Sequence, residues 1–299
     1  MANNDNLKGA FLMSFAMAGF TVNDAMVKLV APDLNTGQIM FIRGALTTVL
    51  IFAVAWRLGA LRPLRMLADR YLLLRTIGEI FASITYVSAL KMLPLPNAAA
   101  ILQALPLAVT MGAALFFAEP VGWRRWGAIL AGLFGVIVII RPGAEGFTMG
   151  SLLVVGSVVA AAIRDLSTRR INPEIPSLLI SAVTALVITS VGATLIVPFG
   201  GWQPVSGFDI AALGLGALAL FAGYQTVIMA MRVGDISFIA PFRYTGLIWS
   251  IILGALMLSE FPDVWMLVGS AIVISAGLYS FYRESRIARA MDANATLTS

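Results

Sequence analysis

Apolar runs of about twenty residues recur along the whole chain, separated by short polar links. The hydrocarbon core of a bilayer, about 30 Å thick, is crossed by roughly 20 helical residues. Whole segments are apolar, without the alternation of a barrel strand, so the runs predict helices. The sequence thus predicts an all-α polytopic membrane protein with ten transmembrane helices. The expected spans are 7–30, 36–56, 71–91, 96–118, 125–140, 148–168, 177–197, 209–230, 237–258 and 263–282.

Composition limits the chemistry that such a chain can carry. Only 12% of its residues are charged, against roughly 25% in a soluble domain. It has no Cys and no His, which excludes thiol chemistry, structural zinc, haem and His-based acid–base catalysis. We therefore expect no metal and no cofactor. The first run is long enough to span a bilayer and no cleavage motif follows it, so we expect it to be retained.

Basic residues predict the orientation, because Lys and Arg concentrate in short loops on the cytoplasmic side. With the N-terminus inside, only Lys28, Lys91 and Arg141 fall outside. Both termini should then be cytoplasmic. The net charge of +5 does not indicate nucleic-acid binding, since the basic residues sit in short membrane-flanking loops. The basic residues predicted to lie inside are Lys8, Arg57, Arg62, Arg65, Arg70, Arg124, Arg125, Arg169, Arg170, Arg232, Arg283, Arg286 and Arg289.

An internal repeat becomes visible when the chain is shifted by 141 residues. The shift places Asp24 on Asp165, Lys28 on Arg169 and Glu119 on Glu260. Each copy would hold five helices, an odd number, so the second copy enters the membrane inverted. The basic loop 57–70 also falls opposite 198–211, which has no Lys or Arg. The predicted units are a first repeat at 1–145, a second at 146–284 and a polar cytoplasmic tail at 285–299, as in many secondary transporters.

Ionisable residues inside the spans are candidates for gates. Each costs about 2.5–3.5 kcal/mol at a helix centre on insertion scales, so it normally faces the bundle interior or water. Similar depths predict an outer pair, Asp24 with Arg43. An inner pair would join Asp165 to Arg243 or Glu79. The alternative is that these pairs only hold helices together, while Arg75 and Arg164 extend to the membrane surface.

Polar and aromatic residues near the middle of the spans are candidates for a solute cavity. Gln103 and Tyr244 occupy equivalent positions in the two repeats. Aromatic walls with a few amides suit a planar, uncharged solute, although Tyr and Trp also form belts at membrane surfaces. The small residues Gly127, Ala131 and Gly135 indicate close helix packing, within the fold or in a homodimer. The candidate substrate-binding residues are Tyr86, Gln103, Tyr224, Gln225, Tyr244 and Trp249.

Several motifs resemble the EamA repeat of the drug/metabolite transporter superfamily. They are LPLPNAAAILQALPL, the Glu119-Pro120 corner, Trp123-Arg124-Arg125 and the closing Arg141-Pro142-Gly143. In the second half Tyr282-Arg283-Glu284 replaces that closure. The resemblance implies two inverted five-helix EamA repeats in a bacterial inner membrane. It also implies secondary transport of a small organic metabolite by alternating access.

Within the superfamily, NTGQIMFIRG and AAAILQALPLAV resemble the bacterial riboflavin-uptake branch, so riboflavin is the expected solute. The alternatives are an exporter of amino acids or other metabolites, or a carrier of S-adenosylmethionine. An intramembrane enzyme is a remote alternative, because in a chain without His or Cys only a pair of carboxylates could serve as the catalytic groups. The Gly-x-Gly-Asp signature of membrane aspartyl proteases is also absent, since Arg232-Val233 precedes Gly234-Asp235. A channel is disfavoured because no ring of like charges is visible. We therefore expect a transporter and no enzymatic activity.

Overall fold

A computed structural model of the chain confirms the all-helical membrane architecture. It describes residues 2–57, 69–119, 121–141, 148–233 and 236–298. Within these ranges, ten helical stretches are long and apolar enough to cross a membrane. The expected repeat boundary at 145/146, the motif residues Pro120, Pro142 and Gly143, the loop arginines Arg62 and Arg65, and Gly234-Asp235 lie outside the described residues.

The helices follow the predicted apolar runs closely, because in lipid each backbone must satisfy its own hydrogen bonds. The first half contains α1 (Ala2–Val30), α2 (Thr36–Arg57), α3 (Arg70–Leu90), α4 (Leu95–Leu102), α5 (Leu105–Phe117) and α6 (Trp123–Ile140). The second half contains α7 (Met149–Thr168), α8 (Ser177–Leu195), α9 (Gly207–Val233), α10 (Ile236–Ile239), the short 3-10 helix η2 (Ala240–Tyr244), α11 (Thr245–Leu258) and α12 (Val264–Thr298).

Two spans expected as single helices are broken, which corrects the sequence prediction. The run 96–118 divides into α4 and α5 around Gln103, and the run 237–258 divides into α10, η2 and α11. Pro106 and Pro241 explain the breaks, since proline lacks a backbone N–H and its ring clashes with the carbonyl four residues earlier. The breaks put Gln103 and Tyr244, which are equivalent in the repeat, at non-α-helical positions inside the membrane region.

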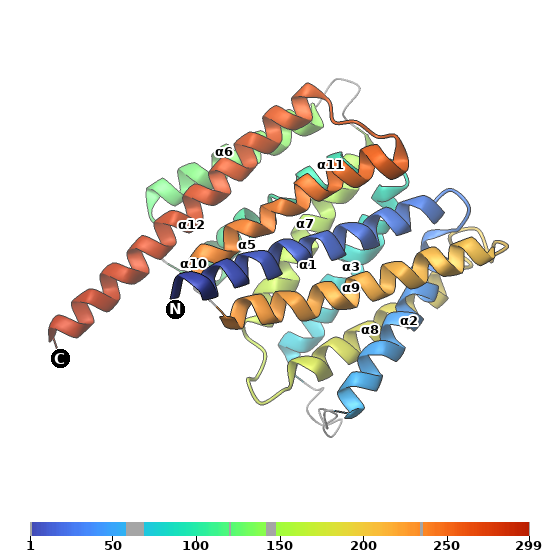
Figure 1. The fold of residues 1–299 in the computed structure, drawn as a ribbon, viewed down its shortest axis with the longest axis horizontal. Coiled ribbons are helices and arrows are strands. Elements are labelled where there is room, and N and C mark those ends of the chain that lie inside the picture. The colour runs from blue at the N-terminus through green and yellow to red at the C-terminus, as the bar shows by residue number, and fades with distance from the viewer. Residues whose placement is uncertain (1, 58–68, 120, 142–147, 234–235, 299) are drawn as a thin grey trace.

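The expected polar tail is also different from the prediction. It does not fray after Tyr282 but continues as part of α12 to Thr298, which extends beyond the rest of the bundle (Figure 1). The segment after Tyr282 contains no Gly or Pro and is rich in Ala and Arg, which are strong helix formers. The RPG closure of the first half has no counterpart there to end the helix.

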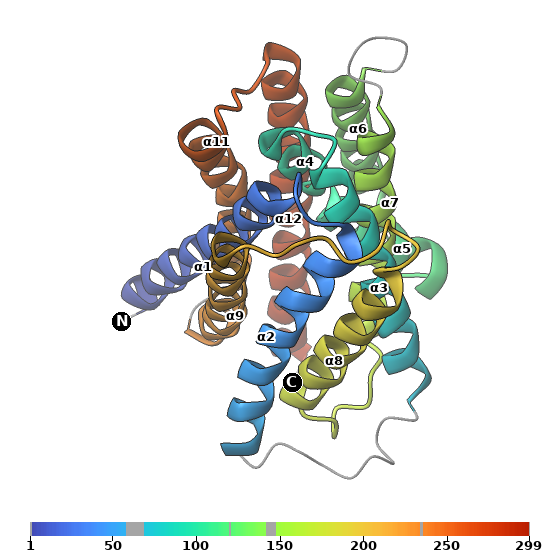
Figure 2. The same cartoon turned by 90° about the vertical axis from the view of Figure 1, so that its right-hand side faces the viewer.

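Helix pairing follows the inverted repeat. α1 packs along α9 and α3 along α7, two pairs that exchange when the repeats are exchanged. α2 packs along α8 and α6 along α12, and each of these pairs joins equivalent helices (Figures 1 and 2). Ala118 and Ser259, 141 positions apart, both end their helices in the left-handed conformation, with φ of 51° and 55°. The two halves therefore share backbone detail as well as topology.

Of the small residues predicted to mediate close packing in α6, Gly135 is used within the chain, whereas Gly127 and Ala131 are exposed. A Cβ placed on Gly135 would lie 2.8 Å from the carbonyl oxygen of Gly269, and one on Gly269 would lie 2.6 Å from that of Gly135. The two backbones therefore approach as closely as glycine allows. This packing of α6 on α12 accounts for Gly135 without a second copy of the chain.

The bundle has two different ends. The Lys28 end contains the links 31–35, 91–94 and 259–263, and the Arg169 end contains residues 118–119 and 121–122 and the link 169–176. The start of α1 and the end of α12 lie on the same side of the molecule (Figure 1). Most of the largest apolar core lies toward the Lys28 end, with Leu34, Ile39 and Leu95 among its fully buried side chains. The Lys28 end is thus the more tightly packed one.

Candidate functional site

A cavity lies between α2, α3, α8 and α9, in the half of the bundle nearer the Arg169 end. Its wall runs from Arg43 and Gly44, near the middle of α2, to Ser177 and Leu178 in the first turn of α8. Polar groups are spread along an otherwise apolar wall, as in many small-molecule sites. The polar lining includes Arg43, Arg75, Glu79, Ser83, Tyr224 and Gln225.

The cavity unites four of the residues predicted from the sequence, Arg43, Glu79, Tyr224 and Gln225. Tyr224 approaches the charged residues of the site from α9 and contacts Phe20 of α1 edge-to-face, with ring centroids 5.2 Å apart. The other predicted residues do not line this cavity. They are Asp24, Tyr86, Gln103, Asp165, Arg243, Tyr244 and Trp249.

Asp24 belongs to a cluster that connects α1, α2 and α3. The Tyr86 hydroxyl donates to one carboxylate oxygen of Asp24 at 2.9 Å, and the Asn23 amide donates to the other at 2.9 Å. Arg43 donates to Asn23 at 3.1 Å and not to Asp24. This corrects the expected direct ion pair, because an uncharged amide bridges the two charges.

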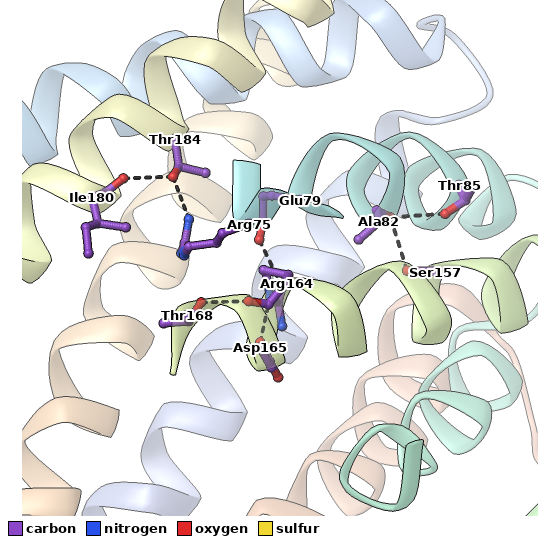
Figure 3. Close-up of polar contacts among 10 residues, drawn as sticks. All are labelled: Arg75, Glu79, Ala82, Thr85, Ser157, Arg164, Asp165, Thr168, Ile180 and Thr184. Carbon is purple, nitrogen blue, oxygen red and sulfur yellow. Dashed lines mark hydrogen bonds and ion pairs between the residues drawn. The ribbon is translucent and has the colours of Figure 1, made fainter. Parts of the chain in front are cut away.

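Glu79 and Asp165 are joined by Arg164, which the sequence analysis placed at the membrane surface as an alternative. Arg164 contacts Glu79 at 3.1 Å and Asp165 at 2.7 Å, and only 22% of its side chain is exposed. Figure 3 shows both carboxylates directed at the same guanidinium. Arg75, one turn from Glu79, donates to Thr184 of α8 at 2.6 Å.

Arg243 lies elsewhere, which corrects the other expected inner pair. It is exposed in η2, and among the described residues no ion pair or hydrogen bond joins it to Asp165. The similar depth of the two residues along the membrane therefore does not bring their side chains together. Asp165 instead forms its ion pair with Arg164, the residue that precedes it.

The two residues at the helix breaks have different surroundings. The side-chain amide of Gln103 lies beside Gly246 at the start of α11. Tyr244 is buried against Gly277 and Phe281 of α12, and its hydroxyl has no hydrogen-bond partner among the described residues. Trp249 donates to the Ser14 carbonyl at 3.2 Å and so ties α11 to α1. In this conformation the three residues connect helices and do not face the cavity.

Two equivalent ion pairs at opposite ends were missed as pairs by the sequence analysis. At the Lys28 end, Lys28 contacts Glu260 at 3.0 Å, with side chains 12% and 20% exposed. At the other end their counterparts in the repeat, Arg169 and Glu119, are 3.9 Å apart and 55% and 49% exposed. The signal was present in the shift of 141 residues, which aligned Lys28 with Arg169 and Glu119 with Glu260.

The Lys28–Glu260 pair is strengthened by backbone contacts. The Lys28 ammonium also donates to the carbonyls of Leu90, at 2.9 Å, and Leu93. Glu260 accepts from the backbone N–H of Leu95 at 2.6 Å. Charge-assisted hydrogen bonds of this kind are stronger than neutral ones. They bind the ends of α1, α3 and α11 and the start of α4 together.

Within the described ranges, no group of three or more acidic side chains could hold a metal ion.

Comparison with known proteins agrees with a membrane transporter. Residues 7–141 match the EamA-like transporter family. The chain is 27% identical over 293 residues to an S-adenosylmethionine uptake transporter of Rickettsia felis, covering 95% of this chain and 97% of that protein. It is also 27% identical over 288 residues to a riboflavin transporter of Vibrio cholerae, covering 95% and 96% of the two proteins.

A third relative is a pseudopaline exporter of Pseudomonas aeruginosa, 25% identical over 276 residues, with 90% of this chain and 94% of that protein covered. A crystal structure of another protein has the same fold, with a TM-score of 0.60, 20% identity and coverage of 91% of this chain and 96% of that one. The relatives are transporters by name, and the names divide among different solutes and directions.

Proposed function

Because this chain is a member of the drug/metabolite transporter superfamily, with an EamA domain over residues 7–141, we propose that it moves a small organic metabolite across the membrane by alternating access. In this proposal the cavity between α2, α3, α8 and α9 receives the solute from the Arg169 end. A rearrangement of the two repeats then opens the same site toward the Lys28 end. The proposal places the Arg169 end in the cytoplasm of a bacterium, which the basic loops support.

The observation that carries the proposal is the difference between the two equivalent ion pairs, one tight and one loose. The Lys28 end has the main apolar core and the tight Lys28–Glu260 pair. The Arg169 end has the cavity and the loose Arg169–Glu119 pair. Equivalent residues in two inverted repeats thus have different surroundings, which is what one state of an alternating-access cycle requires.

The opposite state would exchange these surroundings. Arg169 and Glu119 would then close on each other as Lys28 and Glu260 do here. We therefore assign the gates to these two pairs. In the proposal Glu79 and Asp165 couple the two repeats and do not form a gate, because movement of α7 against α3 would separate Arg164 from Glu79. Asp24 and Arg43 stay within the α1–α2–α3 cluster that faces the closed end.

The solute is proposed here as a class, a small organic metabolite. The motifs in α2 and α4 resemble the riboflavin-uptake branch, and Phe221, Tyr224 and Gln225 offer the aromatic and amide contacts that a flavin ring could use. The S-adenosylmethionine carrier is equally similar to this chain, at 27% identity. Riboflavin and S-adenosylmethionine are therefore the first two solutes to test.

The test combines solute uptake with access to the cavity. The chain has no Cys, so Ser181→Cys places a single thiol in the cavity wall. In proteoliposomes we expect Lys28→Gln to slow the reaction of this thiol with a maleimide supplied at the Arg169 end. Loss of the tight pair shifts the population toward the state that is open at the Lys28 end. Uptake of the transported solute should fall in the same variant.

Arg169→Gln is the matched control, because it removes the equivalent charge from a pair that is already loose. It should leave the thiol at least as reactive as in the parent. If Lys28→Gln changed only thermal stability while labelling and uptake stayed as in the parent, the assignment of the Lys28–Glu260 pair as a gate would be wrong. If neither riboflavin nor S-adenosylmethionine nor an amino-acid mixture crossed the membrane, the proposed function itself would be contradicted.

A further inference from the structure

Two guanidinium groups line the cavity without contacting a carboxylate. Arg43 donates to the neutral amide oxygen of Asn23, and Arg75 donates to the neutral hydroxyl of Thr184. Among the described residues, no Asp or Glu lies within 4 Å of the nitrogens of either side chain. A cation in a membrane interior normally pairs with an anion or faces water. Both of these cations face the cavity.

The nearby carboxylates are engaged by other groups. Asp24 accepts from Tyr86 and Asn23. Arg164, which does not line the cavity, contacts both Glu79 and Asp165. The fold therefore uses one arginine to hold two carboxylates and leaves the two cavity arginines with neutral partners. An anion that enters the cavity would find both of them available.

The repeat indicates that Arg43 is not required for the packing of α2 on α8. Its equivalent in the second half is Thr184 of α8. α2 and α8 pack against each other as equivalent helices, yet one carries a guanidinium and the other a hydroxyl at this position. The close approach of the pair is provided by glycines, since a Cβ on Gly44 would lie 2.6 Å from the Thr189 hydroxyl oxygen. A charge inside the membrane region that the α2–α8 contact does not need, and that faces a cavity, points to a ligand.

The positions along the helices give the two arginines different roles. Arg43 is seven residues from the start of α2, about 10 Å below the Lys28 end at 1.5 Å per residue. Arg75 is five residues from the start of α3, about 8 Å from the Arg169 end. In a cavity that reaches toward the Arg169 end, Arg75 stands near the mouth and Arg43 at the deep end, with Glu79 and Tyr224 also in the wall.

We infer that the solute is a zwitterion of the amino-acid type, whose carboxylate is bound by Arg43 and whose cationic group faces Glu79. This inference rests on the proposed transport function and specifies its substrate class. The planar fork of arginine suits a carboxylate. The requirement for a cationic group follows from charge balance. The charged side chains in and next to the cavity already sum to zero, so a solute that carried only a negative charge would leave the site with a net charge. That set contains three positive and three negative side chains, Arg43, Arg75, Arg164, Asp24, Glu79 and Asp165.

The experiment compares solutes that differ only in the carboxylate. S-adenosylmethionine and its decarboxylated derivative are one such pair, and L-tyrosine and tyramine are another. Riboflavin serves as a neutral solute. Uptake into proteoliposomes is measured for the parent, for Arg43→Gln, and for Arg57→Gln, an exposed arginine at the end of the same helix. Thermal unfolding in detergent shows whether each variant is folded.

We expect the parent to prefer at least one carboxylate-bearing solute over its decarboxylated partner by about ten-fold or more, the effect of one charge-assisted contact. Arg43→Gln should remove that preference while the protein stays folded, and Arg57→Gln should retain it. Uptake of riboflavin that is insensitive to Arg43→Gln, or equal uptake of both members of each pair, would overturn the inference and leave transport standing. If Arg43→Gln does not fold, Arg43→Thr replaces it, because Thr184 is the equivalent residue of the second repeat; undiminished discrimination in that variant would also overturn the inference. Failure of every solute to enter would count against the proposed function instead.

Discussion

At the scale of single residues, Arg164 holds two carboxylates that would otherwise repel each other in the membrane interior. It contacts Glu79 on α3 and its own neighbour Asp165 on α7. Removing one partner of a buried ion pair leaves an uncompensated charge, which costs far more than a surface ion pair contributes. The stability of the α3–α7 contact should therefore depend on this side chain.

We expect Arg164→Gln to lower the free energy of unfolding by up to about 3–5 kcal/mol, the cost of breaking a fully buried pair, since this pair is partly buried. Thermal unfolding in detergent measures the change. Adding Glu79→Gln to that variant should recover part of the loss, because it removes one of the two stranded carboxylates. A double variant that is less stable than Arg164→Gln alone would contradict this account.

Single residues also show which part of the site could be predicted. The carboxylates Asp24, Glu79 and Asp165 were identified because ionisable groups inside apolar runs are costly. The side chains that contact these carboxylates were not identified, because the position of a residue along a helix gives its depth in the membrane but not the direction in which its side chain points. Asn23 was overlooked because it carries no charge, although it bridges Asp24 and Arg43.

At the scale of helices, the breaks in the fourth and ninth spans distinguish this fold from a plain bundle of ten continuous helices. Apolar runs predicted both spans as continuous, since hydropathy does not register where a backbone hydrogen bond is missing. Pro106 and Pro241 contained that information. Discontinuous helices at corresponding positions of inverted repeats mark binding sites in many transporters. Gln103 and Tyr244 lie at these two breaks.

We expect Pro106→Ala to reduce uptake several-fold without loss of stability. Alanine supplies the missing N–H and favours one continuous helix, which would move Gln103 away from the start of α11. Uptake in proteoliposomes and thermal unfolding are the two measurements. Pro198→Ala is the control, since Pro198 is exposed in the turn after α8. If both variants transported at the parental rate, the break would have no role in the cycle.

At the scale of the whole molecule, the inverted repeat was the most informative pattern in the sequence. The shift of 141 residues predicted five helices in each half, and the observed helix pairs are those that such a two-fold relation produces. It did not reveal which state the molecule adopts. Two states of an inverted repeat share one sequence pattern, so only the spatial arrangement shows that the ion pair at the Lys28 end is the tight one and that the cavity between α2, α3, α8 and α9 lies toward the Arg169 end.

The orientation of the bundle in the membrane is the last prediction, and it decides the direction from which the cavity is filled. Pro204 is exposed on the Lys28 side and Glu174 is exposed in the link at the Arg169 end. In a chain without other Cys, Pro204→Cys should react with a membrane-impermeant maleimide in intact cells, and Glu174→Cys only after the cells are opened. The concentration of arginines at the Arg169 end is the physical reason, because such loops stay in the cytoplasm. The reverse labelling pattern would place the open cavity on the outside, and the state seen here would then be the one that captures external solute.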